Sequence, residues 1–170
     1  EVDQVIYLGE DDALGAFVKT HESVGDDLDV EQRVAQVAAT GSPSDIEDVL
    51  LRLRGIRYLE KLRVAPRPPT RAMEMLDDRI VLIVREKATI EEEDVVNSNL
   101  VVYGDARELM FKRFGPRCFF SPGPLAGGHV GLVDDRSETG GVVLHAIDVD
   151  GEIRWMEPIQ GRGAKVMVAP

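Results

Sequence analysis

Cysteine is nearly absent from this sequence of 170 residues, because Cys118 is the only one. A single thiol excludes an internal disulfide framework and a cysteine-based zinc site, and it fits the reducing cytoplasm, where we expect the protein to reside. No apolar run reaches the length of a transmembrane helix, and no basic-then-apolar leader opens the chain. We therefore expect neither a membrane partner nor a signal peptide.

Basic residues are also scarce, with 20 Lys and Arg against 31 Asp and Glu, which gives a net charge of −11. This acidic balance argues against non-specific binding to nucleic acid. The bases gather in residues 51–90, which form either a solvated helix and loop or a docking face. The length and the 44% hydrophobic content predict one domain over residues 1–170.

Three apolar segments are typical of buried strands, namely residues 2–9, 79–84 and 100–104. Their continuous apolar runs predict central, largely parallel strands, and this includes the first of them. Residues 65–71 contain three prolines, which predict an exposed extended loop.

Helices are predicted between these strands from capping boxes, in which a polar side chain and an acid or amide three residues later satisfy the first backbone N–H groups. The predicted helices end near Gly41, Tyr58 and Val96. The capping pairs are Asp29 with Gln32, Ser44 with Glu47, and Thr89 with Glu92.

The second half of the chain predicts antiparallel hairpins. Residues 108–123 turn near Gly115, and residues 141–159 alternate apolar and polar side chains around the turn signal Asp150-Gly151. The glycine-rich segment 125–131 lacks the Gly-Lys-Ser/Thr of a phosphate-binding loop and is interpreted as a connector. Ser121 lacks the frame of a nucleophilic serine, and Cys118 is expected to be a small core residue.

Charged residues follow each of the three predicted strands: Glu10, then Arg85 with Glu86, then Asp105 with Arg107. Ligands gather at the carboxyl ends of parallel strands, so these ends are where we expect a site.

The order of these segments resembles the calcineurin-like metallophosphoesterases, especially the small bacterial phosphodiesterases and the related retromer scaffold subunit. "VIYLGE" stands where that family has "LGD", "VLIVRE" at its single-histidine strand, "VVYGDAR" at "GHTH", and "FFSPGPL" at the "NPGS" turn. "GGVVLHAIDVDGEIRWMEPI" is similar to the closing hairpin of the family. The resemblance implies an α/β fold, an αββα sandwich of two mixed sheets. The opening strand of the family, which carries Asp-x-His, is expected to be missing from this chain.

The departures from the family pattern concern its metal ligands. The resemblance places Glu10 at the bridging aspartate, Arg85 or Glu86 near the single histidine, and Asp105 and Arg107 at the two histidines of "GHTH". A guanidinium is always protonated and cannot ligate a metal. The resemblance therefore implies a degenerate member without catalytic residues, metal or other cofactor, in which these five positions are the remnant of a site.

Two hypotheses follow for this remnant site. In the first, Arg85 and Arg107 pair with Glu10 and Asp105 as a salt-bridge cluster in place of the metals, and the protein is a pseudoenzyme. It then acts as a scaffold or interaction module for another protein or for its own copy, and the candidate surface comprises residues 51–71 with the proline loop. An anion held by the two arginines is a further reading.

In the second hypothesis the protein is an active metal-dependent phosphoesterase with two divalent metals such as Mn. That reading requires Glu10, Glu86 and Asp105 together with ligands from an upstream segment. Of the three histidines, only His129 is placed by the sequence near the strand ends.

Overall fold

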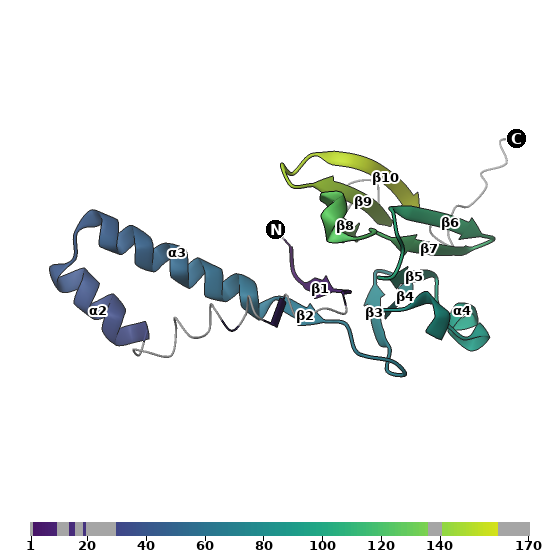
Figure 1. Cartoon of the computed structure of the whole chain (residues 1–170), viewed down its shortest axis with the longest axis horizontal. Helices are drawn as coiled ribbons and strands as arrows, with labels where there is room; N and C mark the ends of the chain where they lie inside the picture. Colours follow the sequence, from purple (N-terminus) through teal and green to yellow (C-terminus); the bar gives the residue numbers. More distant parts are fainter. Residues whose placement is uncertain (1, 10–13, 16–18, 20–29, 136–140, 160–170) are drawn as a thin grey trace, which may run out of the picture. The chain divides into compact units, whose positions relative to one another are not determined.

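The computed structural model describes residues 2–9, 14–15, 19, 30–135 and 141–159 (Figure 1). The chain divides into two compact units, Glu1–Val64 and Ala65–Pro170, and each is described here by itself. The single domain over residues 1–170 stays a prediction.

The first unit contains a small parallel sheet and two helices. Strand β1 (Val5–Tyr7) pairs with β2 (Leu62–Val64), and helices α2 (Val30–Thr40) and α3 (Pro43–Glu60) lie between them in the chain. The prediction of a central first strand is wrong in the described part of the chain, because β1 pairs there with β2 alone and Val5 is 46% exposed. Its apolar run therefore does not mark a strand buried on both faces.

The start of α3 also differs from the prediction. The capping box is formed by Ser42 and Asp45, whose carboxylate accepts the Ser42 N–H at 2.7 Å, and not by Ser44 and Glu47. Pro43 explains the shift, since proline is favoured at the first helical position, where its missing N–H costs nothing. The predicted end of α2 is confirmed, with Gly41 N–H donating to the Val37 carbonyl; the predicted cap Asp29 lies outside the described residues.

The second unit is built on a mixed five-stranded sheet with the order β3-β4-β5-β7-β6. Its two central pairings, β4–β5 and β5–β7, are parallel, and the outer strands β3 and β6 are antiparallel to their neighbours. Strands β4 and β5 agree with two of the predicted buried strands, and the β6–β7 hairpin is the predicted one. The strands are β3 (Ala72–Leu76), β4 (Arg79–Val84), β5 (Leu100–Tyr103), β6 (Met110–Phe114) and β7 (Arg117–Ser121).

Strand β3 was not foreseen in the sequence. It is joined to β4 by Asp77 and Asp78, and Asp77 has a positive φ of 53°, which Asp and Asn tolerate better than most residues. The turn therefore forms without the Asn-Gly or Asp-Gly pair that usually signals a hairpin. Before β3, Arg67–Thr70 are exposed as predicted for the proline loop, although Ala65 is buried.

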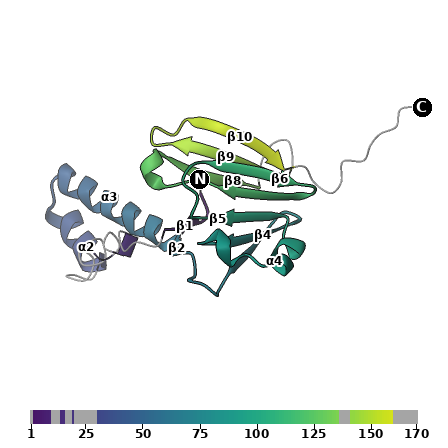
Figure 2. The ribbon, with the colours of Figure 1, turned by 45° about the vertical axis from the view of Figure 1, so that its right-hand side comes forward.

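A three-stranded antiparallel sheet covers one face of the five-stranded sheet (Figure 2). It comprises β8 (His129–Asp134), β9 (Val142–Asp148) and β10 (Ile153–Ile159), and the predicted closing hairpin is β9–β10. Trp155 joins the sheets, with its ring centroid 5.8 Å from that of Phe120 and 5.4 Å from that of Phe111. The predicted connector 125–131 instead contains a 3-10 helix, η2 (Leu125–Gly127), and the start of β8.

The opposite face of the five-stranded sheet is covered by the segment that joins β4 to β5. This segment contains the 3-10 helix η1 (Lys87–Thr89) and the short helix α4 (Glu92–Asn97). Ile90, Ala106, Met110 and Phe119 pack there against a fully buried cluster. The cluster residues are Leu82, Val84, Val101 and Tyr103.

The N-cap of α4 is Glu91, whose N–H is accepted by the Asp94 carboxylate at 2.8 Å. The predicted pair of Thr89 and Glu92 is therefore wrong. Thr89 belongs to η1, where its hydroxyl donates to the Glu86 carbonyl at 2.8 Å.

We predict that Leu82→Ala lowers the free energy of unfolding by about 2–5 kcal/mol, because it leaves a cavity in a side-chain cluster that excludes water. Leu82 is 1% exposed, whereas Leu125 is 66% exposed, so Leu125→Ala is the matched control, with an expected change within about 0.5 kcal/mol. Urea unfolding followed by circular dichroism measures both. Equal losses in the two variants would contradict this assignment of the core.

Candidate functional site

The carboxyl ends of β4 and β5 meet, as the sequence predicted for two of its three charged strand ends. The parallel register pairs Val84 with Tyr103, and Gly104 N–H donates to the Arg85 carbonyl at 2.9 Å. Arg85, Glu86, Asp105 and Arg107 follow these strands and are called here the strand-end site. Glu10, the fifth predicted member, lies outside the described residues.

Arg85 is buried, with 7% of its surface exposed. Its Nε donates to the carbonyl oxygen of Ala65 at 2.7 Å, which ties the start of the proline loop to the end of β4. The Arg85 side chain therefore has a structural partner in the backbone of its own unit.

Asp105 is exposed, and its Oδ1 accepts the backbone N–H of Lys87 at 2.9 Å. That N–H opens η1, so Asp105 acts as a cap for the turn that leaves β4. The Lys87 ammonium lies 5.7 Å from the ring centroid of buried Tyr103. Burial, and then the charge of Asp105, raise the pKa of the Tyr103 phenol above its ordinary value.

The remaining predicted residues have less defined roles. Glu86 is half-buried, and its carbonyl rather than its carboxylate is engaged, by Thr89. Arg107 is exposed. His129 begins β8 opposite Asp148 of β9, and its Nδ1 lies 3.1 Å from the Gly127 carbonyl. Its described contacts are therefore within its own sheet and η2, and not with the strand-end site.

The described residues do not form the salt bridges that were predicted for Asp105. Among the described residues, neither Arg85 nor Arg107 forms an ion pair with Asp105, because Asp105 is turned to the Lys87 N–H and Arg85 to the Ala65 carbonyl. The part of the hypothesis that involves Glu10 stays a prediction.

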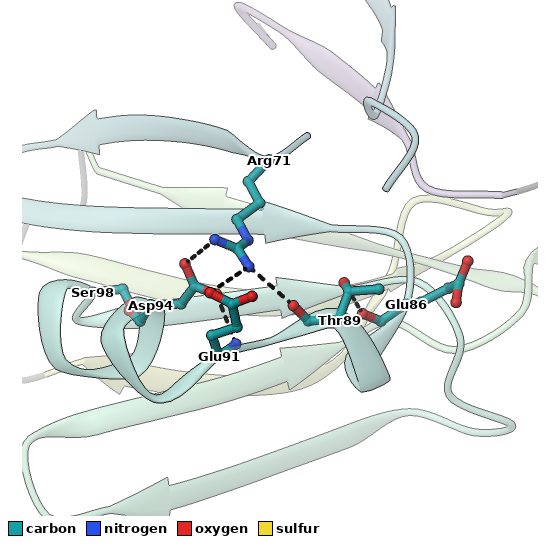
Figure 3. Close-up of polar contacts among 6 residues, drawn as sticks. All are labelled: Arg71, Glu86, Thr89, Glu91, Asp94 and Ser98. Carbon is teal, nitrogen blue, oxygen red and sulfur yellow. Dashed lines mark hydrogen bonds and ion pairs between the residues drawn. The ribbon is translucent and has the colours of Figure 1, made fainter. Parts of the chain in front are cut away.

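A different arginine forms the charged network beside this site. Arg71, at the end of the proline loop, reaches Asp94 with Nη1 at 2.9 Å and Glu91 with Nη2 at 3.3 Å (Figure 3). Nη2 also donates to the Thr89 carbonyl at 3.2 Å. These contacts, called here the Arg71 clamp, fasten η1 and α4 to the start of β3. The Asp94 side chain is only 11% exposed, so its ion pair is largely shielded from water.

Sequence reasoning did not find the Arg71 clamp. The sequence places Arg71 in an exposed loop and predicts a helix start at Thr89 and Glu92, with no link between the two segments. The clamp joins residues about twenty positions apart, so no pattern within a short stretch of sequence predicts it. A lone arginine after a proline-rich turn is a weak signal that becomes informative only once β3 and β4 are paired.

Within the described part of the chain, no three His, Cys, Asp or Glu side chains lie together in a way that suits a metal ion. Cys118 is 2% exposed, and burial raises the pKa of its thiol, in agreement with the predicted core role. None of the described helices is long and apolar enough to cross a membrane.

Neither a protein-family profile nor a curated protein sequence matches the chain. Solved structures that it resembles include Vps29 from Entamoeba histolytica, with 12% identity over 69% of this chain and 77% of that one and a TM-score of 0.45.

The similar structures also include phosphoesterase-type proteins. A predicted phosphoesterase from Streptococcus pneumoniae is 13% identical over 59% of this chain and 71% of that one, with a TM-score of 0.44. An archaeal phosphodiesterase is 15% identical over 69% and 62% of the two chains, with a TM-score of 0.36. These similar structures belong to the group of proteins that the sequence resembles, and no residue role is taken from them.

We predict that Asp105→Ala destabilises the protein by about 0.5–1.5 kcal/mol, because the Lys87 N–H loses its acceptor. Asp105→Asn should stay close to the wild type, since an amide oxygen accepts the same hydrogen bond. Thermal and urea unfolding of the two variants test this difference. If the two variants lose equal stability, the charge of Asp105 matters and its role as a cap is wrong.

We predict that Arg71→Ala lowers the free energy of unfolding by roughly 1–2 kcal/mol, because the nearly buried carboxylate of Asp94 loses its charged partner. Arg154→Ala is the control, since the Arg154 side chain is 60% exposed and its partner Asp148 keeps the backbone N–H groups of Asp150 and Glu152, so the loss should stay under about 1 kcal/mol. Arg71→Lys should recover only part of the loss, because an ammonium lacks the guanidinium fork. A result in which Arg154→Ala costs more than Arg71→Ala would contradict the assignment.

Proposed function

We propose that this protein is a phosphoesterase-like chain without phosphoesterase chemistry, which acts as a protein-interaction or scaffold module and takes no metal cofactor. One observation carries the proposal: two residues at the predicted metal positions are engaged with backbone groups. Arg85 holds the Ala65 carbonyl, and Asp105 holds the Lys87 N–H. Such side chains support the chain at the place where catalysis would require free ligands.

The type of residue at these positions supports the same proposal. Arg107 and Arg85 are permanently charged and have no lone pair to give to a metal. A two-metal centre needs several His, Asp or Asn ligands around both ions. Of the strand-end site, only Glu86 and Asp105 have oxygen atoms that suit this role.

The partner in this proposal is another protein or a second copy of the chain. The net charge of −11 disfavours nucleic acid as an alternative partner. The proline loop supports a surface role, because Arg67–Thr70 are exposed while both ends of the loop are fixed, at Ala65 by Arg85 and at Arg71 by the clamp. A loop held at its two ends presents a defined surface at a smaller entropic cost than a free one.

The competing function is a metal-dependent phosphoesterase. It is favoured by the half-buried Glu86 and the exposed Asp105, which end neighbouring parallel strands, the usual place for ligands. That function would need Mn or a similar ion and further ligands, including Glu10.

We expect no hydrolysis of bis-p-nitrophenyl phosphate above the buffer rate when Mn is added to the full chain. We also expect no stoichiometric Mn or Zn in elemental analysis after dialysis. Asp105→Asn is the control, because it preserves the cap of η1 but weakens any metal ligand at that position. Hydrolysis that depends on Mn and is lost in Asp105→Asn would establish the enzyme and refute the proposal.

A further inference from the structure

Strand β3 is one of the two edges of the five-stranded sheet, and it differs from the other sheet edges of its unit. In the described residues it pairs with β4 alone, so one row of its backbone N–H and C=O groups has no strand beside it. Native proteins usually protect such an edge with charge, proline, glycine or a bulge, because it readily pairs with another strand.

The other three edges carry such protection. β6 has Lys112 and Arg113 at its centre, and β8 is interrupted by Gly131. β10 contains Pro158 and an irregular register between Ile153 and Trp155. β3 has no proline, glycine, base or bulge, and its single charge is Glu74.

The exposed side chains of β3 are apolar. Met73 is 57% exposed and Met75 is 73% exposed, although their partners on β4, Leu82 and Ile80, are buried or half-buried. The two methionines therefore extend the apolar outer face of the sheet to its edge. Methionine is enriched at protein interfaces and adapts its shape to a partner.

We infer that β3 binds the β3 strand of a second copy of this chain, antiparallel and about a two-fold axis at Glu74, so that two five-stranded sheets become one. This inference deepens the proposed function, on which it rests, by naming the partner of the interaction module. Isologous pairing of this kind needs a surface that is complementary to itself.

The order of residues along β3 has this property. Met73 and Met75 lie on one face of the strand, on either side of Glu74. An antiparallel copy centred at Glu74 places Met73 opposite the second copy's Met75, and Met75 opposite its Met73. Directly opposite side chains share a face, so the outer face pairs methionine with methionine twice. Arg71 takes no part in this pairing, because it is held by Asp94, Glu91 and the Thr89 carbonyl of its own chain.

Glu74 disfavours the pairing, because it lies opposite the second copy's Glu74 at the centre of the other face. Like charges directly opposite each other weaken a strand pair. The inferred dimer is therefore a modest one, and Glu74→Gln should tighten it severalfold. If the partner were instead a strand with a base opposite Glu74, Glu74→Gln would weaken the association.

The experiment measures molar mass by light scattering after size exclusion, as the concentration of the full chain is raised through the micromolar range. We expect the mass to rise from 18.7 kDa toward twice that value. Met75→Lys should weaken the dimer about tenfold, because a charge replaces an apolar partner at both symmetric contacts. Met156→Lys is the control, since Met156 on β10 of the other sheet is a second strongly exposed methionine, at 57% against 73% for Met75, and it should leave the dimer unchanged.

The double variant Met73→Glu with Met75→Lys tests the register. In the inferred register the new acid of each copy faces the new base of the other, so the double variant should recover most of the association lost in Met75→Lys. In a register shifted by two residues, like charges would meet and the loss would deepen. Circular dichroism of each variant checks that the exposed substitutions leave the fold intact.

A mass of one chain at all concentrations would overturn the inference, and so would a loss in Met156→Lys equal to that in Met75→Lys or no recovery in the double variant. The phosphodiesterase assay is run on the same preparation. Hydrolysis removes the proposed function whatever the mass, whereas a monomer without hydrolysis removes only the β3 dimer.

Discussion

The parallel pairing of β4 with β5 is the constraint on which the second unit depends. It buries Val81–Val84 against Leu100–Tyr103 and fixes where the connecting segment must cross. The crossing segment, with η1 and α4, covers one face of the sheet, and β7 continues the parallel order on the far side. The two charged strand ends meet because the strands run in the same direction, and Gly104 and Arg85 then close the pairing with one more hydrogen bond.

Polar groups around this pairing serve mainly to hold the backbone. Arg85 fixes the start of the proline loop, the Arg71 clamp fixes its end, and Asp105 caps the first turn after β4. Together they position one continuous segment from residue 65 to residue 94. This arrangement is consistent with the proposed loss of catalysis, because Arg85 and Asp105 already form hydrogen bonds that hold the backbone.

Much of the second unit could be predicted from the sequence. The continuous apolar runs of β4 and β5 and the alternation of side chains in β9 each lie within a few consecutive residues. Such local patterns can be recognised in the sequence alone. β3 was missed because its methionines and Glu74 do not form a strong strand pattern and its turn lacks glycine. The cap of α4 was placed two residues early, because Thr89 and Glu91 both precede suitable partners and only the local backbone selects between them.

The sequence by itself determined the buried strands β4 and β5, the β6–β7 and β9–β10 hairpins, the acidic balance, and the presence of Arg85, Asp105 and Arg107 after two buried strands. Only the tertiary structure decided what those side chains contact. It turned Arg85 to the Ala65 carbonyl and Asp105 to the Lys87 N–H, and it joined Arg71 to Asp94. The physical reason is that hydrogen bonds and ion pairs depend on distances of about 3 Å between atoms of residues distant in the chain. Those distances are set by the pairing and packing of strands and not by local pattern.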